Sequence, residues 1–409
     1  MSRLPSASPL AAGKFVAGGL LPSLARGLFS PRRGTMKRLT ALNADGRTVS
    51  LLSGLKRKYG GEGVRLLGGR MVVLWGSDAL HEVLDRSADV YASDSGAKGK
   101  GMSHFQPDAL TLSRGEEWKD RRAFTEAVLA SGSRHPDAER MEAVVADEVA
   151  RLEVADELTW EQWEQLFDRI TLRIIFGDRA RDDAELTQLL EDLMGEANRI
   201  AGLSTSDEYY ELYARLEKLL IDPEPGSLVA RIPDAPQTVT TRVVQQLPHW
   251  MFAMRDTLGA NCFRALAAIV AQPTDDLEGA LQEAMRLWPT TPLLARETTR
   301  DTTLVGEDLK EGTQVMIVNV FNHRDPDGVP DADRFVPERW SNGARDDYRF
   351  NALSHGTQSC PGGGLVSLIG TAVLERALAR WDLELLEPEL GDPQPHMVDF
   401  YAIRFRVTA

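Results

Sequence analysis

The stretch SHGTQSCPGG, residues 354–363, places one of only two cysteines between small polar residues and glycines, directly before an apolar segment. A cysteine thiolate acts as a nucleophile or as a metal ligand, and both roles need a positive environment. Cys360 precedes a helix predicted for Leu365–Leu383, whose N-terminal amides and dipole would stabilise a negative sulfur. Gly356 and Gly362 would let the backbone turn tightly and approach a large, flat partner.

Several roles for Cys360 can be compared on this stretch. Zinc would need further ligands nearby, and the stretch offers none. Papain-like catalysis would need a positioned histidine, and His355 is five residues away in the sequence. Haem iron needs a single cysteinate, and backbone N–H groups tune such a ligand. Haem ligation and a purely structural cysteine therefore remain as two equal alternatives.

The composition is that of a globular protein, with 43% hydrophobic and 26% charged residues in 409. The net charge of −14 argues against a nucleic-acid partner, because nothing would neutralise phosphates. Cys262 and Cys360 are too far apart and too few for a disulfide framework, which suits a reducing cytosol. The apolar region Ser8–Phe29 is interrupted by charges and a proline, so we expect neither a membrane span nor a secretory signal. We therefore expect a cytoplasmic protein without a membrane partner.

Periodicity predicts a small sheet followed by many helices. Gly63–Gly69 and Arg70–Gly76 indicate two short strands joined by a glycine turn. Ser77 is expected to cap a helix that ends near Arg86. Asp94–Asp108, rich in glycine, indicates a loop, and residues 114–226 are mostly helical by period.

The C-terminal half contains the most apolar helix of the chain. A helix over Thr238–Gln272 is too apolar in its middle to lie on a surface, so we expect it in the core. Pro248 predicts a kink or a late start in it. Further helices are expected at Leu277–Leu287 and Leu365–Leu383. The fold class is mainly α with small β-sheets: an irregular N-terminal arm and first helices over residues 1–60, packed on one large domain over 61–409.

Three motifs in order carry a family resemblance. The segment LSHGTQSCPG resembles the cysteine-ligand loop of the cytochrome P-450 superfamily, Phe-x-x-Gly-x-x-x-Cys-x-Gly, with Leu353 at the Phe position. Upstream, Glu283 and Arg286 match the family's Glu-x-x-Arg helix, and FVPERW supplies Arg339. By resemblance these three residues form a structural triad. The likeness covers the chain from about Gly61 onward. Within the family, the chain resembles bacterial, actinobacterial-type members.

The resemblance implies a cytochrome P-450 fold with haem between the long central helix and the cysteine-bearing helix. The cofactor would be haem b (heme b, iron protoporphyrin IX), with Cys360 as the iron ligand. The family usually has His or Arg two positions before the cysteine; Gln358 stands there, so a propionate would be held by this amide or by His355. The residues implied to contact the haem are Cys360, Trp118, Arg122, Arg296, His355, Gln358, Gly356 and Gly362.

The resemblance also implies the residues for oxygen chemistry. Asp256 and Thr257 match the family's acid–alcohol pair, which delivers protons inside a dry pocket. The family's neighbouring groove glycine is Met254 here, and only 26 positions separate Thr257 from Glu283, which is short for the family. Arg255 should face away from the iron if Thr257 faces it, which disfavours a peroxide-driven peroxygenase.

The implied function is a haem-thiolate monooxygenase of secondary metabolism, acting on a hydrophobic or amphipathic small molecule with electrons from a ferredoxin and its reductase. Lys98, Lys100 and Arg255 leave room for an anionic group on that substrate. A catalytically silent, ligand-binding or recruiting haem module stays open as an alternative, because of Met254 and the short connection. The implied substrate-pocket residues are Phe252, Ala253, Met254, Leu293, Leu294 and Val398.

Overall fold

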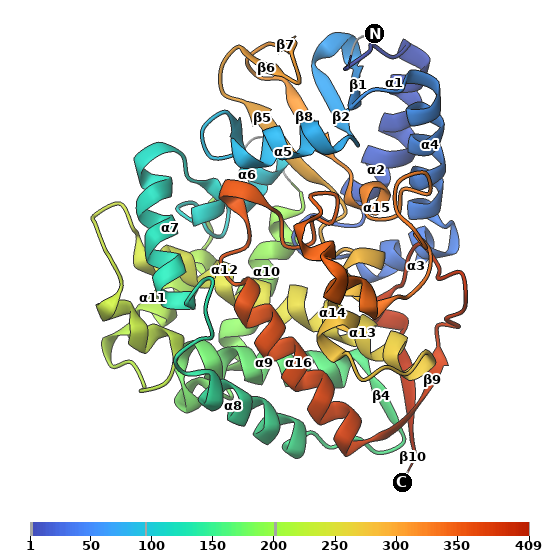
Figure 1. Cartoon of the computed structure of the whole chain (residues 1–409). Helices are drawn as coiled ribbons and strands as arrows, with labels where there is room; N and C mark the ends of the chain where they lie inside the picture. Colours follow the sequence, from blue (N-terminus) through green and yellow to red (C-terminus); the bar gives the residue numbers. More distant parts are fainter. Residues whose placement is uncertain (1–2, 95, 200–202, 409) are drawn as a thin grey trace. The chain divides into compact units, whose positions relative to one another are not determined.

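The computed structural model describes residues 3–94, 96–199 and 203–408 (Figure 1). Their contacts divide into two compact units. Unit 1 comprises residues 1–95, 282–360 and 390–399, and unit 2 comprises residues 96–281, 361–389 and 400–409. The helix α14, Leu277–Leu287, contains the boundary between them and has the bounds expected from the sequence. The mainly helical fold class with small sheets is confirmed.

Unit 1 is built around a five-stranded sheet in the order β1-β2-β8-β5-β3. β2 and β8 are parallel, and the other neighbours are antiparallel. Alternate residues of β2 enter two different apolar clusters: Met71 and Val73 one, Val72 and Leu74 the other. Both faces of the strand are therefore buried, which explains why its sequence is continuously apolar. The strands of unit 1 are β1 Gly63–Leu66, β2 Met71–Leu74, β3 Tyr91–Ala92, β5 Leu294–Thr298, β6 Thr302–Leu304, β7 Glu307–Leu309 and β8 Gln314–Ile317.

Helices cover both faces of this sheet. Phe15 of α1 and Leu52 of α4 belong to the first cluster, and Leu80 of α5 belongs to the second. The helices of unit 1 are α1 Pro9–Phe15, α2 Leu21–Ala25, α3 Arg33–Ala41, α4 Ala44–Tyr59, α5 Ser77–Asp85 and α15 Asn319–Asn322.

Two expectations for unit 1 are wrong. The region Ser8–Phe29 is largely helical rather than irregular, because residues of α1 such as Phe15 have a buried partner surface that periodicity alone did not reveal. Ser77 is the first residue of α5 and not its cap. The carboxylate of Glu62 caps this helix instead, accepting the N–H of Ala79 at 3.1 Å.

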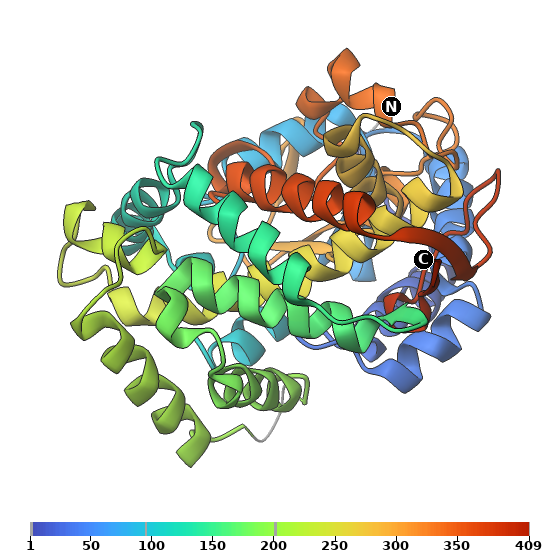
Figure 2. The same cartoon turned by 90° about the horizontal axis from the view of Figure 1, so that it is seen from below.

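Unit 2 is mostly helical, with a small antiparallel sheet in the order β4-β10-β9. α16 packs along α8, as Figure 2 shows. Its helices are α6 Gly96–Met102, α7 Gly115–Leu129, α8 Ala138–Arg151, α9 Trp160–Phe176, α10 Ala184–Ala197, α11 Asp207–Ile221, α12 Leu247–Phe252, α13 Gly259–Ala271 and α16 Gly363–Arg380, and its strands are β4 Glu157–Thr159, β9 Asp382–Glu387 and β10 Arg404–Thr408.

The central helix of unit 2 consists of α12, a π-helical segment Ala253–Leu258, and α13. It begins at Leu247, about nine residues later than the sequence pattern indicates, and Pro248 stands in its first turn, where a missing N–H costs nothing. Most of α13 is buried, as its apolar sequence predicts. Trp163 of α9 donates its indole N–H to the carbonyl of Gly259 at 3.0 Å, which fixes α9 against the central helix.

The segment Asp94–Asp108 is not a plain loop, because residues 96–102 form α6. Ser95 lies outside the described residues. Three glycines lower the helix propensity of this stretch, so tertiary contacts override it here. No helix in the described part of the chain is both long enough and apolar enough to cross a bilayer.

Candidate active site

The cysteine loop of unit 1 is closed by its own backbone. The N–H of Cys360 donates to the carbonyl of Leu353 at 2.7 Å, and the N–H of Ser359 donates to that of Gly356 at 3.1 Å. Gly356 has a φ of 63°, and a Cβ there would collide with the carbonyl of Leu84. Only glycine therefore fits this position. Cys360 itself is exposed, so the loop presents its side chain to solvent or to a ligand.

The two candidate propionate partners in this loop differ in their surroundings. His355 lies near the carbonyl of Phe350, 3.2 Å from Nε2, and its ring stacks on Tyr348 with centroids 4.5 Å apart. Gln358 has a buried Oε1 without a partner in the described chain. The imidazole is thus already used inside the loop, whereas the amide has an unsatisfied polar atom.

Arg296, on β5 of unit 1, is a buried cation without a carboxylate. Its side chain donates to Ser87 Oγ at 3.1 Å and to the carbonyl of Ala295 at 3.0 Å. The residue is 4% exposed, and no carboxylate of the described chain pairs with it. Burial lowers its pKa to about 10. A buried guanidinium in neutral surroundings is costly unless an anion joins it.

The predicted triad residues meet in unit 1. Arg286 Nε and Nη2 donate to the two oxygens of Glu283 at 2.8 and 2.7 Å, and both side chains are fully buried. Arg339 Nε lies 3.5 Å from the same carboxylate. Trp340, which the sequence did not single out, donates its indole N–H to it at 3.0 Å. The remaining Arg286 donors reach three backbone carbonyls of the segment 323–334, so the network fixes that irregular segment.

The other expected haem contacts lie in unit 2. Trp118, on α7, is partly exposed, and its indole N–H has no partner among the described residues. Arg122, one turn further along, pairs with Glu126 at 2.6 Å. Gly362 stands at the N-terminus of α16 as its capping residue. Of these groups, the indole N–H of Trp118 remains available to donate to a ligand.

Asp256 and Thr257 lie in the π-helical segment of unit 2. Asp256 Oδ1 accepts from Arg255 Nη1 at 3.0 Å, whereas Oδ2 is buried and has no partner in the described part of the chain. Burial raises the pKa of this carboxyl to about 7; Arg255 opposes the shift, and neighbouring carboxylates reinforce it. The hydroxyl of the half-buried Thr257 is not bonded to its own helix, in contrast to the usual habit of helical threonines.

Arg255 is the centre of a cluster of carboxylates. It pairs with Asp168 of α9, with Asp256, and with Glu191 of α10 at 3.1 Å, and Glu164 lies 3.8 Å away. Burial also raises the pKa of Asp168 and of Glu164. All the donor nitrogens of this guanidinium face acids of the chain itself, so it has no room for a substrate carboxylate. That geometry agrees with the expectation that Arg255 does not serve a peroxygenase.

The predicted pocket residues fall into two groups by exposure. Phe252 and Ala253 of unit 2, and Leu293 and Leu294 of unit 1, are partly exposed. Met254 and Val398 are 7% and 1% exposed, which is typical of core residues.

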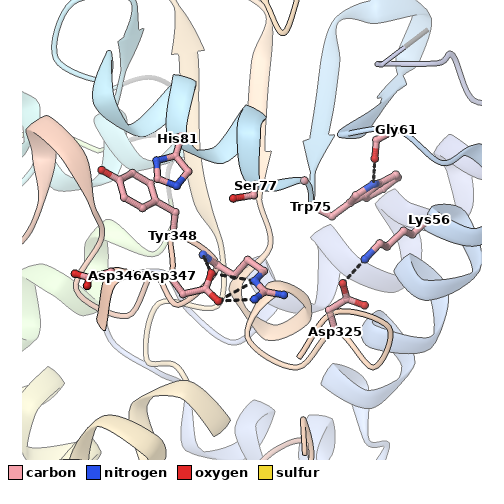
Figure 3. A pocket seen from close by; sticks show the side chains of 11 residues that line it. Lys56, Gly61, Trp75, Ser77, His81, Asp325, Asp346, Asp347 and Tyr348 are labelled. Atoms are coloured by element: carbon pink, nitrogen blue, oxygen red, sulfur yellow. Dashed lines mark hydrogen bonds and ion pairs between the residues drawn. The ribbon is translucent and has the colours of Figure 1, made fainter. Parts of the chain in front are cut away.

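A separate pocket of about 440 Å³ opens in unit 1 (Figure 3). Lys56 pairs with Asp325, and Arg349 pairs with Asp347, at its rim. Since both cations are already neutralised within the chain, they do not select an anion, and we assign the pocket no ligand. Its wall also holds the stacked rings of His81 and Tyr348, 3.6 Å apart.

Sequence analysis missed the acids around Arg255. Asp168 is 87 positions from Arg255, and Glu191 is 64 positions away. Both stand on helices other than the one that carries Arg255, so sequence spacing carries no signal for them. Trp340 could have been found, because it directly follows Arg339 in the FVPERW motif.

Comparison with known proteins gives matches to one family. The sequence model of the cytochrome P450 family matches residues 277–401. Cytochrome P450 monooxygenase sphH of Aspergillus fumigatus is 32% identical over 121 residues, 28% of this chain and 22% of that protein. Cytochrome P450 monooxygenase lnbC of Aspergillus flavus is 34% identical over 156 residues, 37% of this chain and 30% of that protein. The matches thus span less than a third of the length of these relatives.

The likeness of fold is more extensive than the likeness of sequence. CYP175A1 of Thermus thermophilus superposes with a TM-score of 0.69 at 19% identity, covering 92% of this chain and 98% of that one. A second, six-coordinated cytochrome P450 of the same species gives a TM-score of 0.68 at 18% identity over 88% of this chain and 98% of that one. The chain therefore has the cytochrome P450 fold, and its residues 277–401 match the sequence model of the cytochrome P450 family.

Proposed function

We propose that the protein is a haem-thiolate monooxygenase that holds haem b through the sulfur of Cys360. The reaction is substrate-H + O2 + 2 electrons + 2 protons → substrate-OH + H2O, and the substrate is a hydrophobic or amphipathic small molecule. Bound haem with a cysteinate ligand supplies the cleavage of O2. The chain's own residues hold the cofactor, exclude water and supply protons.

The observation that carries this proposal is the isolated cation of Arg296. Its side chain is buried, bonded only to a hydroxyl and a carbonyl, and not paired with any carboxylate of the described residues. A haem propionate supplies the missing negative charge, and guanidinium–carboxylate pairing is among the strongest of hydrogen-bonded contacts. The indole N–H of Trp118 in unit 2 is a donor without a partner among the described residues, and a donor of this kind suits a carboxylate.

We assign the delivery of the two protons of the reaction to Asp256 and Thr257. A carboxyl group whose pKa is about 7 carries a proton in roughly half of the molecules at neutral pH. Such a group gives a proton up and takes it back with little driving force in either direction. The hydroxyl of Thr257, the next residue, can then pass the proton on because it has no competing bond to its helix.

The partner and the pathway are part of the same proposal. Two electrons must come from a protein donor, and we assign this role to a ferredoxin with its reductase. The relatives sphH and lnbC are named monooxygenases, which supports oxygen insertion. We place the protein in the cytoplasm and its reaction in secondary metabolism.

The test replaces each of the two cysteines in turn. In Cys360→Ser, the ferrous–CO complex should lose its red-shifted Soret band, because a hydroxyl does not replace a thiolate as an electron-rich ligand. Cys262→Ala is the matched control: Cys262 is fully buried in α13, so the band should persist. An unchanged band in Cys360→Ser would exclude the sulfur as the ligand.

A further inference from the structure

The guanidinium of Arg255 in unit 2 is divided among acids from three helical segments. Nε donates to Asp168 of α9, Nη1 donates to Asp256 of the π-helical segment at 3.0 Å, and Nη2 donates to Glu191 of α10 at 3.1 Å. Each nitrogen of the guanidinium therefore faces a different carboxylate. Arg255 is 5% exposed, so the closely packed interior leaves its side chain little room to turn while these contacts hold.

This division leaves Asp256 with a single donor. Guanidinium groups frequently bind a carboxylate through two parallel N–H···O bonds. Here the second oxygen, Oδ2, is buried and accepts no hydrogen bond from any described residue. Asp168 and Glu191 occupy the other two nitrogens, so the guanidinium cannot present a second donor to Asp256 unless one of those pairs breaks. A buried oxygen without a donor is costly while it is anionic, and a proton removes that charge.

The helix α9 brings a further acid to this cluster. Glu164 lies 3.8 Å from Nη2 of Arg255. The next cation on α9, Arg169, pairs with Asp182 at 3.7 Å. Within the described chain, Asp256 has one ion pair, which is the one with Arg255. Acids therefore outnumber the cation in this cluster, and like charges that share a buried site raise the proton affinity of one another.

The other elements that pack against the π-helical segment are α12, α13 and α16. On α12, His249 stays neutral at pH 7, because burial lowers its pKa to about 4. On α13, burial raises the pKa of Cys262, so its thiol stays protonated, and the guanidinium of Arg264 lies over the ring of Phe400. Residues 363–372 of α16 include no titratable side chain. In the described chain none of these groups pairs with Asp256.

We propose that Asp168 and Glu191 are positioning residues for the proton donor Asp256. By holding Nε and Nη2 of Arg255, they limit that carboxyl to one hydrogen bond and so keep a proton on its other oxygen. The inference rests on the proposed function and describes how its proton supply is regulated. The pKa of Asp256, which burial raises to about 7, agrees with a proton that is held and released near neutral pH.

Removing either positioning residue should lower the proton affinity of Asp256 for two reasons. The released nitrogen of Arg255 allows the guanidinium to turn and bind both oxygens of that carboxyl. The substitution also removes one neighbouring negative charge, and both changes favour the carboxylate form. A role limited to packing α9 and α10 against the central helix would instead lower stability and leave the proton affinity of Asp256 unchanged.

The test is an infrared titration of the full chain that follows the C=O stretch of protonated carboxyl groups from about pH 5 to about pH 9. The band of Asp256 is the one that is missing in Asp256→Asn. Its midpoint should fall by about one pH unit or more in Asp168→Asn and in Glu191→Gln. The variants Asp168→Glu and Glu191→Asp keep an acid at each position and should shift the midpoint less.

Asp192→Asn is the matched control, because Asp192 is exposed beside Glu191 and accepts a hydrogen bond from Gln188 at 2.9 Å. It should leave the midpoint unchanged. The side chain of Glu191 is 44% exposed, so Glu191→Gln should fold even if Asp168→Asn does not. An unchanged or raised midpoint in either variant would exclude the proposed role of the acid removed. An equal fall in Asp192→Asn would exclude it for both.

Turnover gives a second readout that a purely structural role would not move. As pH rises, the fraction of electrons that end in product should decline at a lower pH in Asp168→Asn than in the wild type, by the same shift as the infrared midpoint. A decline at the wild-type pH would remove Asp168 from the reaction. If the protein binds no haem, the proposed function fails, whereas the infrared titration still decides whether the two acids control the proton of Asp256.

Discussion

Two buried charge clusters, one in each unit, have opposite stoichiometry. In unit 1, the single carboxylate of Glu283 faces two guanidinium groups, an indole N–H and the backbone N–H of Val336. In unit 2, the single guanidinium of Arg255 faces four carboxyl groups. Where donors are in excess, every carboxylate oxygen is satisfied. Where acceptors are in excess, Asp256 Oδ2 has no partner among the described residues, and a proton is the simplest way to satisfy it.

This difference separates a structural role from a chemical one. The first cluster is held by charges that do not change near neutral pH, because arginine stays protonated. The second can change its charge by gaining or losing a proton. The three predictions that follow test this contrast.

The largest effect is expected for Glu283→Ala. The change leaves Arg286 and Arg339 as buried cations without a carboxylate, which typically costs about 3–5 kcal/mol. Urea unfolding should show this loss, or the protein should fail to accumulate in folded form. The control Glu338→Ala lies in the same segment but is exposed, and should be close to neutral. A loss below about 1 kcal/mol would mean that the network does not fix the segment.

A smaller and pH-dependent loss is expected for Arg255→Met. Without the guanidinium, the four acids repel one another, but they can relieve the repulsion by binding protons. Unfolding in urea should show a destabilisation of about 1–3 kcal/mol near pH 8 that diminishes toward pH 5. A loss of equal size at both pH values would show that the acids do not share protons in this way.

A change of slope with pH is expected in Asp256→Asn. An unfolded aspartate ionises near pH 3.9, whereas the folded carboxyl ionises at about 7. Between these values the folded state keeps a proton that the unfolded state has lost, so stability falls as pH rises, by at most about 1.4 kcal/mol per unit. Above about pH 7 this contribution is constant.

The substitution should remove that slope, measured as the difference from the wild type in urea unfolding across the same pH range. The exposed Asp192, next to Glu191 on α10, provides the control Asp192→Asn, which should leave the slope intact. A wild-type slope that survives in Asp256→Asn would assign the proton to another carboxyl of the cluster, such as Asp168.

Local sequence patterns predicted those helices and strands whose structure is decided by residues close to them in the chain. The strands β1 and β2 follow from apolar runs between glycines, and α14 has the bounds that its period indicates. The cysteine loop and the Glu283–Arg286 pair could also be located from the sequence, because their residues are close together in the chain. Helices whose stability comes from distant partners were missed, namely α1 and the glycine-rich α6.

The sequence by itself determined that a cysteine, a Glu-x-x-Arg helix and an acid–alcohol pair occur in the order of a haem-thiolate protein. Only the tertiary structure decided which polar groups lack a suitable partner among the described residues: the Arg296 cation has no carboxylate, and Oε1 of Gln358 and Oδ2 of Asp256 have no hydrogen bond. The physical reason is that a polar group finds its hydrogen-bond or charge partner among residues that are far away in the sequence. A motif shows that a group is present, whereas its charge state and its availability are set by groups that folding brings to within about 4 Å.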